Sequence, residues 1–131
     1  MNNMTLNEYQ KQAMTTCMPS SDNFAYMFLN LVGEVGEVAS KVAKAIRKEN
    51  ATIVENDFVI EAKTTKELFI ENPIFDELKK ELGDILWQLS GCCTVFGWTL
   101  EEVGQDNLDK LAARKEAGTI DGNGDGIIRD K

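Results

Sequence analysis

Apolar residues recur at intervals of three and four along two long stretches of the chain, residues 22–49 and residues 72–96. They are Phe24, Phe28, Leu31, Val35, Val38, Val42 and Ile46 in the first stretch, and Ile74, Leu78, Leu82, Ile85, Leu86, Leu89 and Phe96 in the second. This spacing is the period of an amphipathic α-helix. Asn72 before Pro73 is a favourable helix start, a cap with proline at the first helical position. We therefore predict two long amphipathic helices.

Two shorter helices are indicated by capping sequences, in which a threonine is followed three residues later by a glutamate. Thr5-Leu6-Asn7-Glu8 begins a helix that runs to about Thr16. Thr99-Leu100-Glu101-Glu102 begins another that runs to about Ala117, where a glycine ends it. Four helices then account for most of the chain. The predicted fold class is all-α, a four-helix bundle formed by a single domain, residues 1–131.

Two segments lie outside this helical pattern. Residues 50–71 contain two short apolar runs, 52–54 and 58–60, on either side of a polar tripeptide. This pattern is compatible with a small hairpin inserted between the second and third helices. Residues 118–131 are rich in glycine, and we expect them to form a flexible tail.

The charge balance narrows the range of functions. Among 131 residues, 14 are Lys or Arg and 22 are Asp or Glu, which gives a net charge of −8. A protein that binds duplex nucleic acid normally carries a basic surface, so this role is not expected. The N-terminus lacks the pattern of a signal peptide and no apolar run is long enough to span a membrane, so we expect a cytoplasmic protein without a membrane partner.

The chain contains no histidine, which removes histidine-based triads and histidine–zinc sites. Its three cysteines, Cys17, Cys92 and Cys93, are interpreted as reduced and mostly buried thiols, because two are adjacent and none has a histidine to help hold zinc. Any catalysis must therefore use carboxylates, lysines, arginines or a bound metal.

Two pairs of acids have a spacing that places both members on one helical face. They are Glu34 with Glu37 and Glu81 with Asp84. Each pair lies to the same side of the apolar stripe of its helix. If the two long helices are antiparallel and face each other through these stripes, all four carboxylates line one cleft.

Four clustered carboxylates need a counter-charge, because two like charges about 4 Å apart cost about 4 kcal/mol at an effective dielectric of about 20. Oxygen ligands of this kind suit Mg²⁺, with Mn²⁺ as the alternative. The competing interpretation is that these acids are the solvated flanks of amphipathic helices.

Asn107, Lys110 and Arg114 share one face of the fourth helix, where an amide and two cations could hold phosphate oxygens. Alternatively, the basic residues only complement the dipole at the helix C-terminus. Trp87 lies about 180° from the apolar stripe of its helix. It is a candidate to meet a base or another subunit, or else a partly exposed packing residue.

The acidic motifs resemble those of a known family. Glu34-Val35-Gly36-Glu37 and Glu81-Leu82-Gly83-Asp84 resemble the ExxE…ExxD signature of the MazG-like all-α nucleoside triphosphate pyrophosphohydrolases. The run from Asn107 to Arg114 resembles the family's NxxKLxxR, and residues 118–129 resemble its glycine-rich tail. The 43 residues between Glu37 and Glu81 exceed the usual separation, so residues 50–71 are interpreted as an insertion.

The resemblance implies Mg²⁺ held by Glu34, Glu37, Glu81 and Asp84. It further implies a triphosphate bound by Lys110 and Arg114 with Asn107 in support. The expected reaction is hydrolysis between the α and β phosphates, which gives a nucleoside monophosphate and pyrophosphate, with Glu37 or Glu34 as the catalytic carboxylate. The resemblance also implies assembly, because family members form dimers or higher oligomers, and we expect a homodimer or homotetramer.

Other functions remain open at this stage. Hydrolysis of dUTP or dUDP and hydrolysis of phosphoribosyl-ATP are related activities of the same superfamily, and the sequence does not choose among bases. Residues 121–126 imitate the first half of a calcium-binding EF-hand loop but lack its closing glutamate. A helical interaction module without catalytic activity is the remaining alternative.

Overall fold

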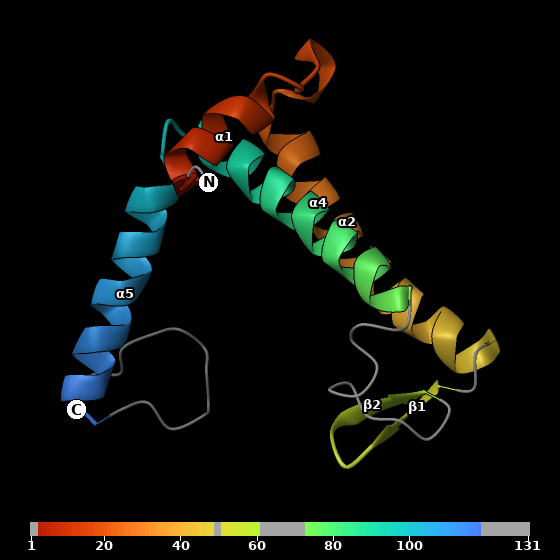
Figure 1. Ribbon diagram of the computed structural model, residues 1–131. Coiled ribbons are helices and arrows are strands. Elements are labelled where there is room, and N and C mark those ends of the chain that lie inside the picture. The colour runs from red at the N-terminus through yellow and green to blue at the C-terminus, as the bar shows by residue number, and fades with distance from the viewer. Residues whose placement is uncertain (1–2, 49–50, 61–72, 119–131) are drawn as a thin grey trace.

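The computed structural model describes residues 3–48, 51–60 and 73–118. In chain order the elements are α1 (Leu6–Met14), a 3-10 turn (Pro19–Ser21), α2 (Phe24–Lys48), β1 (Ala51–Val54), β2 (Asp57–Ile60), α4 (Ile74–Val95) and α5 (Leu100–Glu116) (Figure 1). Four α-helices dominate, which confirms the predicted all-α class. The expected tail, residues 118–131, lies outside the described residues apart from Gly118. No described helix is long and apolar enough to cross a membrane.

The short helices begin where their capping sequences predict. The Thr5 side chain accepts a hydrogen bond from the Glu8 amide, and the Glu8 side chain accepts one from the Thr5 amide. Thr99 likewise accepts a bond from the Glu102 amide at the start of α5. Pro73, expected at the first helical position, is instead the residue before α4, and Asn72 lies outside the described residues.

The helices α2 and α4 pack along their length as an antiparallel pair, but not through the centres of their apolar stripes (Figure 1). The buried residues of α2 are Met27 and Ala45, whereas Val35 of the predicted stripe is 52% exposed. On α4, Leu82 of the stripe is 57% exposed. The expectation that the stripes face each other is therefore wrong in part: the packed faces are rotated, and one flank of each stripe is left at the surface.

Close packing near Gly91 accounts for this rotation. A Cβ atom added at Gly91 would overlap the side chain of Met27, so the glycine lets α2 approach α4 at this point. Gln88, which is 1% exposed, donates a hydrogen bond to the Met27 carbonyl at 3.1 Å and accepts one from Asn30 at 2.9 Å. Because a buried amide must keep its hydrogen bonds, these contacts fix the rotation of both helices.

Residues 51–60 form the small hairpin that the sequence suggested. Strands β1 and β2 pair antiparallel, with Ala51 opposite Ile60. Their two-residue turn, Glu55 and Asn56, has φ angles of 50° and 70°, which is the left-handed conformation that matches strand twist in tight hairpins. Buried Ala51 and Ile60 pack with Ala45 and Ile74, so the hairpin closes the end of the α2–α4 pair.

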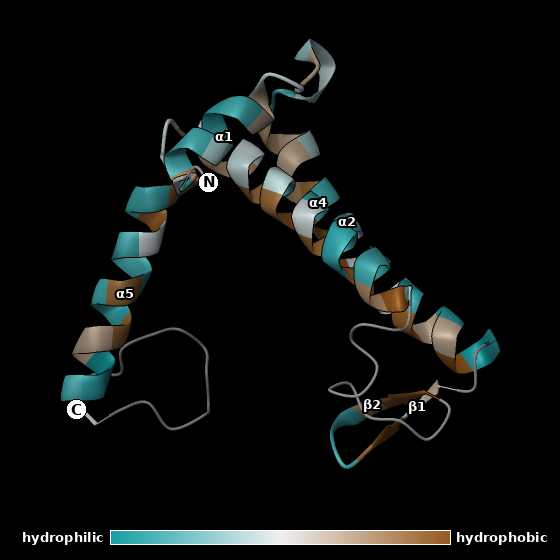
Figure 2. Ribbon diagram, viewed as in Figure 1, coloured by the Kyte–Doolittle hydropathy of each residue, from teal (hydrophilic) through white to brown (hydrophobic). Residues whose placement is uncertain are grey.

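The last helix diverges from the central pair. In Figure 1, α5 leaves the top of α4 and descends on its own, so that the chain has the outline of an inverted V. It contacts α1 and α4, and Gln10 of α1 accepts a hydrogen bond from the Leu100 amide at 2.8 Å. Figure 2 shows apolar positions along the side of α4 that faces α5, across the open space of the V.

Candidate metal centre

Three of the predicted acids converge where α2 and α4 pack. One carboxylate oxygen from each of Glu34, Glu81 and Asp84 lies within 4.8 Å of the others. Glu34 and Glu81 are half-buried and Asp84 is exposed, so the group sits at the edge of the helix seam. This arrangement follows from the rotation of the helices, since Glu34 lies seven residues after buried Met27 and hence on nearly the same line of α2.

The three carboxylates repel one another. Partial burial raises the pKa of Glu34, and the nearby charges of Asp84, Glu81 and Glu37 raise it further. The hydrogen bond from Asn30 acts in the opposite direction. The ionised form of Glu34 is therefore destabilised, and a bound cation would offset the repulsion among the carboxylates. Because all three donors are hard carboxylate oxygens, the group fits a divalent cation such as Mg²⁺.

An amide network orients Glu34 and was not identified from the sequence. The Asn30 side chain donates to Glu34 Oε1 at 3.3 Å and to Gln88 Oε1 at 2.9 Å. Buried Gln88 is in turn bonded to the backbone of α2. Asn30 lies one helical turn before Glu34, and Gln88 lies one turn after Asp84. This spacing could have indicated from the sequence that the two amides lie beside the acids.

Glu37 stands slightly apart from the other acids. It is exposed and is not part of the group of three carboxylates, although its charge contributes to the raised pKa of Glu34. The structure therefore brings three of the four predicted ligands together and leaves Glu37 at the rim.

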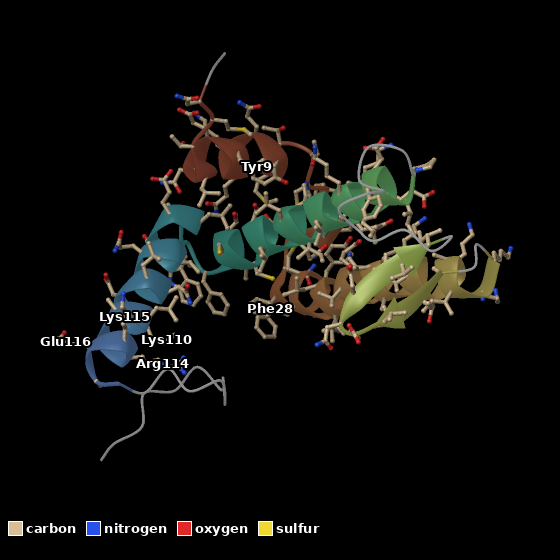
Figure 3. The ribbon with its side chains drawn as sticks, turned by 60° about the horizontal axis from the view of Figure 1, so that its bottom comes forward. Tyr9, Phe28, Lys110, Arg114, Lys115 and Glu116 are labelled. Carbon is tan, nitrogen blue, oxygen red and sulfur yellow. The ribbon has the colours of Figure 1, made fainter. Side chains whose placement is uncertain are left out.

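Two aromatic residues connect the acidic site to α1. Burial and the charge of Asp84 raise the pKa of Tyr9, a residue that the sequence gave no reason to select; Figure 3 places it on α1, which packs against α4. The Trp87 indole donates to the Ala13 carbonyl at 3.1 Å and to Thr16 Oγ1 at 2.8 Å. Of the two interpretations of Trp87, these hydrogen bonds favour a half-buried packing residue over one that meets a base or another subunit.

The predicted phosphate-binding residues lie on α5. Asn107 is exposed, Lys110 half-buried and Arg114 8% exposed. Figure 3 shows Lys110 and Arg114 on the outer part of α5, away from the α2–α4 pair. Within one chain the structure does not bring these three residues to the carboxylates.

Two long antiparallel helices with convergent carboxylates at their seam define an all-α protein with an acidic site of the kind that handles hard cations. This chain belongs to the MazG nucleotide pyrophosphohydrolase family: the model of the MazG nucleotide pyrophosphohydrolase domain matches residues 23–119. The Gene 37 protein of Mycobacterium phage L5 is 35% identical over 106 residues, which are 81% of this chain and 78% of that protein. No solved structure matches the chain.

Proposed function

We propose that this protein hydrolyses a nucleoside triphosphate between its α and β phosphates in the presence of Mg²⁺, releasing a nucleoside monophosphate and pyrophosphate. The observation that carries the proposal is the convergence of Glu34, Glu81 and Asp84 within 4.8 Å, in a chain of the MazG family. House-cleaning of the nucleotide pool is the cellular role that we propose for this reaction.

Glu34, Glu81 and Asp84 would hold the ion, with Glu37 at the rim as a fourth ligand or as the base. When bound, Mg²⁺ would supply positive charge to the phosphoryl oxygens and so lower the cost of charge that develops there. Asn30 keeps Glu34 directed into the group through its 3.3 Å hydrogen bond. This support matters because a carboxylate acts only in the correct orientation.

Glu37 is the better candidate for the general base. It is exposed to solvent and lies one turn from Glu34 on the same helix, so it can reach a water molecule beside the acidic group. From this position its carboxylate can accept the proton of that water as the water attacks phosphorus. Glu34, enclosed by other acids, would serve primarily as a ligand.

The proposal includes a second copy of the chain. Lys110 and Arg114 of α5 do not approach the acidic group of their own chain, so a role on the triphosphate requires that a partner supplies them. Large apolar side chains are left exposed on the central pair: Leu29 is 74% exposed, Val32 72% and Leu82 57%. An apolar surface of this kind favours burial against a second copy, in a homodimer or homotetramer.

Steady-state turnover in Mg²⁺ tests the chemistry. Asp84→Asn and Glu81→Gln remove single ligands without changing side-chain size, and each should lower kcat/KM by at least about 100-fold if one such ligand is worth about 3 kcal/mol. Asp106→Asn, an exposed acid on α5, is the matched control and should retain wild-type activity. Equal activity in all of these folded variants would refute the assignment of the site.

The assembly is tested separately by light scattering after size exclusion. Wild type should elute as a dimer or tetramer, and Val32→Glu should shift it toward the monomer, because the substitution places a charge in the apolar surface. Lys79→Glu makes a larger change in net charge, −2 rather than −1, at an exposed polar position of α4 and should still leave the assembly unchanged. A monomeric wild-type protein at assay concentration would contradict the supply of cations by a partner.

A further inference from the structure

A second feature of the α2–α4 pair lies beside the carboxylates and is not part of them. A cavity of about 290 Å³ is lined by Lys41, Lys44 and Lys48 of α2, and by Pro73, Ile74 and Glu77 at the start of α4. Three ammonium groups against one carboxylate make its lining cationic, in a chain whose net charge is −8. Among the described residues, none of the three lysines forms an ion pair.

This cavity continues the edge that carries the acids. At 100° per residue, Lys41 lies within about 20° of Glu34 around α2, and Lys44 lies within about 20° of Glu37. On α4, Glu77 is one turn before Glu81. Two contacts fix the register of α2 against α4: Asn30 is bonded to Gln88, and Ala45 packs with Ile74. In this antiparallel register, Lys41 lies at about the level of Glu77 along the helix axes.

General helix geometry directs lysine side chains of α2 toward the acidic group. Seven residues separate Glu34 from Lys41, which is about 10 Å along the helix axis, and helical side chains point back toward the N-terminus of their helix. For α2 this direction is that of Glu34. The Lys41 ammonium can therefore approach a group bound at the carboxylates, while Lys44 and Lys48 extend the positive charge farther along the same edge.

Dipole complementation does not explain all three lysines. A cation near a helix C-terminus is stabilised within the last turn only. The last turn of α2 contains Arg47 and Lys48, whereas Lys41 and Lys44 lie before it. The helix dipole therefore does not account for the charges of Lys41 and Lys44. The N-terminus of α4, which carries a partial positive charge, also opens onto the cavity through Pro73 and Ile74.

We infer that the cavity lined by Lys41, Lys44 and Lys48 binds the pyrophosphate product once it has left the carboxylates, before its release from the protein. This inference rests on the proposed function, because that reaction supplies the pyrophosphate. The cavity volume of about 290 Å³ has room for this compact anion.

Inorganic pyrophosphate is the probe, titrated by calorimetry into the full-length protein without divalent metal at about 0.15 M salt, where exposed charges more than about 8 Å apart are largely screened. Wild type should bind it. Lys41→Gln with Lys44→Gln should weaken binding about tenfold or more, because two charge-assisted contacts are lost. Lys44→Arg, which keeps the charge, should bind like wild type. Glu77→Gln should strengthen binding, because it removes the one acid of the lining.

The matched control is Lys79→Gln with Lys80→Gln, which removes the same charge from exposed positions of α4 outside the cavity lining. This variant should bind pyrophosphate within about twofold of wild type, since distant surface charges are partly screened. The inference is overturned if wild type fails to bind pyrophosphate, or if the two double variants lose affinity equally. Circular dichroism of each variant confirms that the helices are intact.

The two proposals fail in different ways. If wild type hydrolyses nucleotides and the Lys41/Lys44 variant does so with unchanged kcat/KM and pyrophosphate affinity, the cavity has no role and the proposed function stands. If no nucleotide is hydrolysed but pyrophosphate binding still depends on Lys41 and Lys44, the anion site is supported and the proposed reaction is wrong.

Discussion

Replacing Asp84 with asparagine removes one of three mutually repelling carboxylates while keeping the size of the side chain. At the 4.8 Å limit, two ionised carboxylates repel by about 3 kcal/mol at an effective dielectric of 20 and by about 1 kcal/mol in water. Asp84 is exposed, so the repulsion of about 1 kcal/mol applies to each of the two carboxylate pairs that it forms, with Glu34 and with Glu81. Without metal, Asp84→Asn should therefore raise the free energy of unfolding by about 1–2 kcal/mol.

For a domain of this length, that stabilisation corresponds to a rise in Tm of about 4–8 °C. The assay is thermal unfolding followed by circular dichroism in EDTA, at low salt and fixed protein concentration. Added Mg²⁺ should reverse the order: an ion at about 100 times its Kd stabilises wild type by about 2.7 kcal/mol, and the variant, which has lost a ligand, by less.

Two results would refute this reasoning. The first is an Asp84→Asn protein that is less stable than wild type in EDTA, because the carboxylate would then be making a favourable contact. The second is an equal gain from Mg²⁺ in both proteins, because the ion would then bind elsewhere. Asp106→Asn is the control for a general effect of net charge and should change Tm little in either buffer.

Two further predictions concern packing and thiol reactivity. Gly91→Ala should destabilise the protein by about 1–3 kcal/mol in urea unfolding, because the new methyl group meets buried Met27. Gly104→Ala should stabilise it by about 0.5–1 kcal/mol, since nothing lies near that helical glycine. Destabilisation of equal size in both variants would contradict the contact between α2 and α4. Half-buried Cys17 should react with a thiol reagent well before Cys92, which is 6% exposed. Burial raises the pKa of both thiols, so the difference in rate depends on exposure. Equal rates in the folded protein would show that the α2–α4 seam opens readily.

The helices could be predicted because their signals are local. Apolar periodicity marked α2 and α4, and the side chains of Thr5 and Thr99 form the hydrogen bonds that capping sequences require. The hairpin at residues 51–60 was harder to predict, because its turn, Glu55 and Asn56, lacks the glycine usual in such turns.

The rotation of α2 against α4 could not be predicted from periodicity. It depends on a long-range fit, in which Gly91 admits Met27 and buried Gln88 bonds to Asn30. An apolar stripe shows which side of a helix is buried. It does not show which neighbouring element packs against each edge of the stripe. The same rotation brings Glu34 into the seam and moves Glu37 to the rim, so the sequence identified the acids but not their separate surroundings.

The distance between α5 and the acidic group also depends on tertiary structure. Lys110 and Arg114 share a helical face, which the sequence shows, but the direction of α5 is set where its start binds α1 through Gln10. Conversely, Lys41 and Lys44 gave no signal as a motif. Their relation to the carboxylates emerged only when the antiparallel pairing placed them on the same edge.

The central claim is that the acidic site supports hydrolysis between the α and β phosphates. The most direct measurement is ³¹P NMR of nucleoside triphosphates, ordinary and modified, incubated with the protein and Mg²⁺. The account predicts monophosphate and pyrophosphate as the products, and no reaction in EDTA. Release of orthophosphate with a diphosphate, or no turnover of any nucleotide by the folded protein, would contradict it.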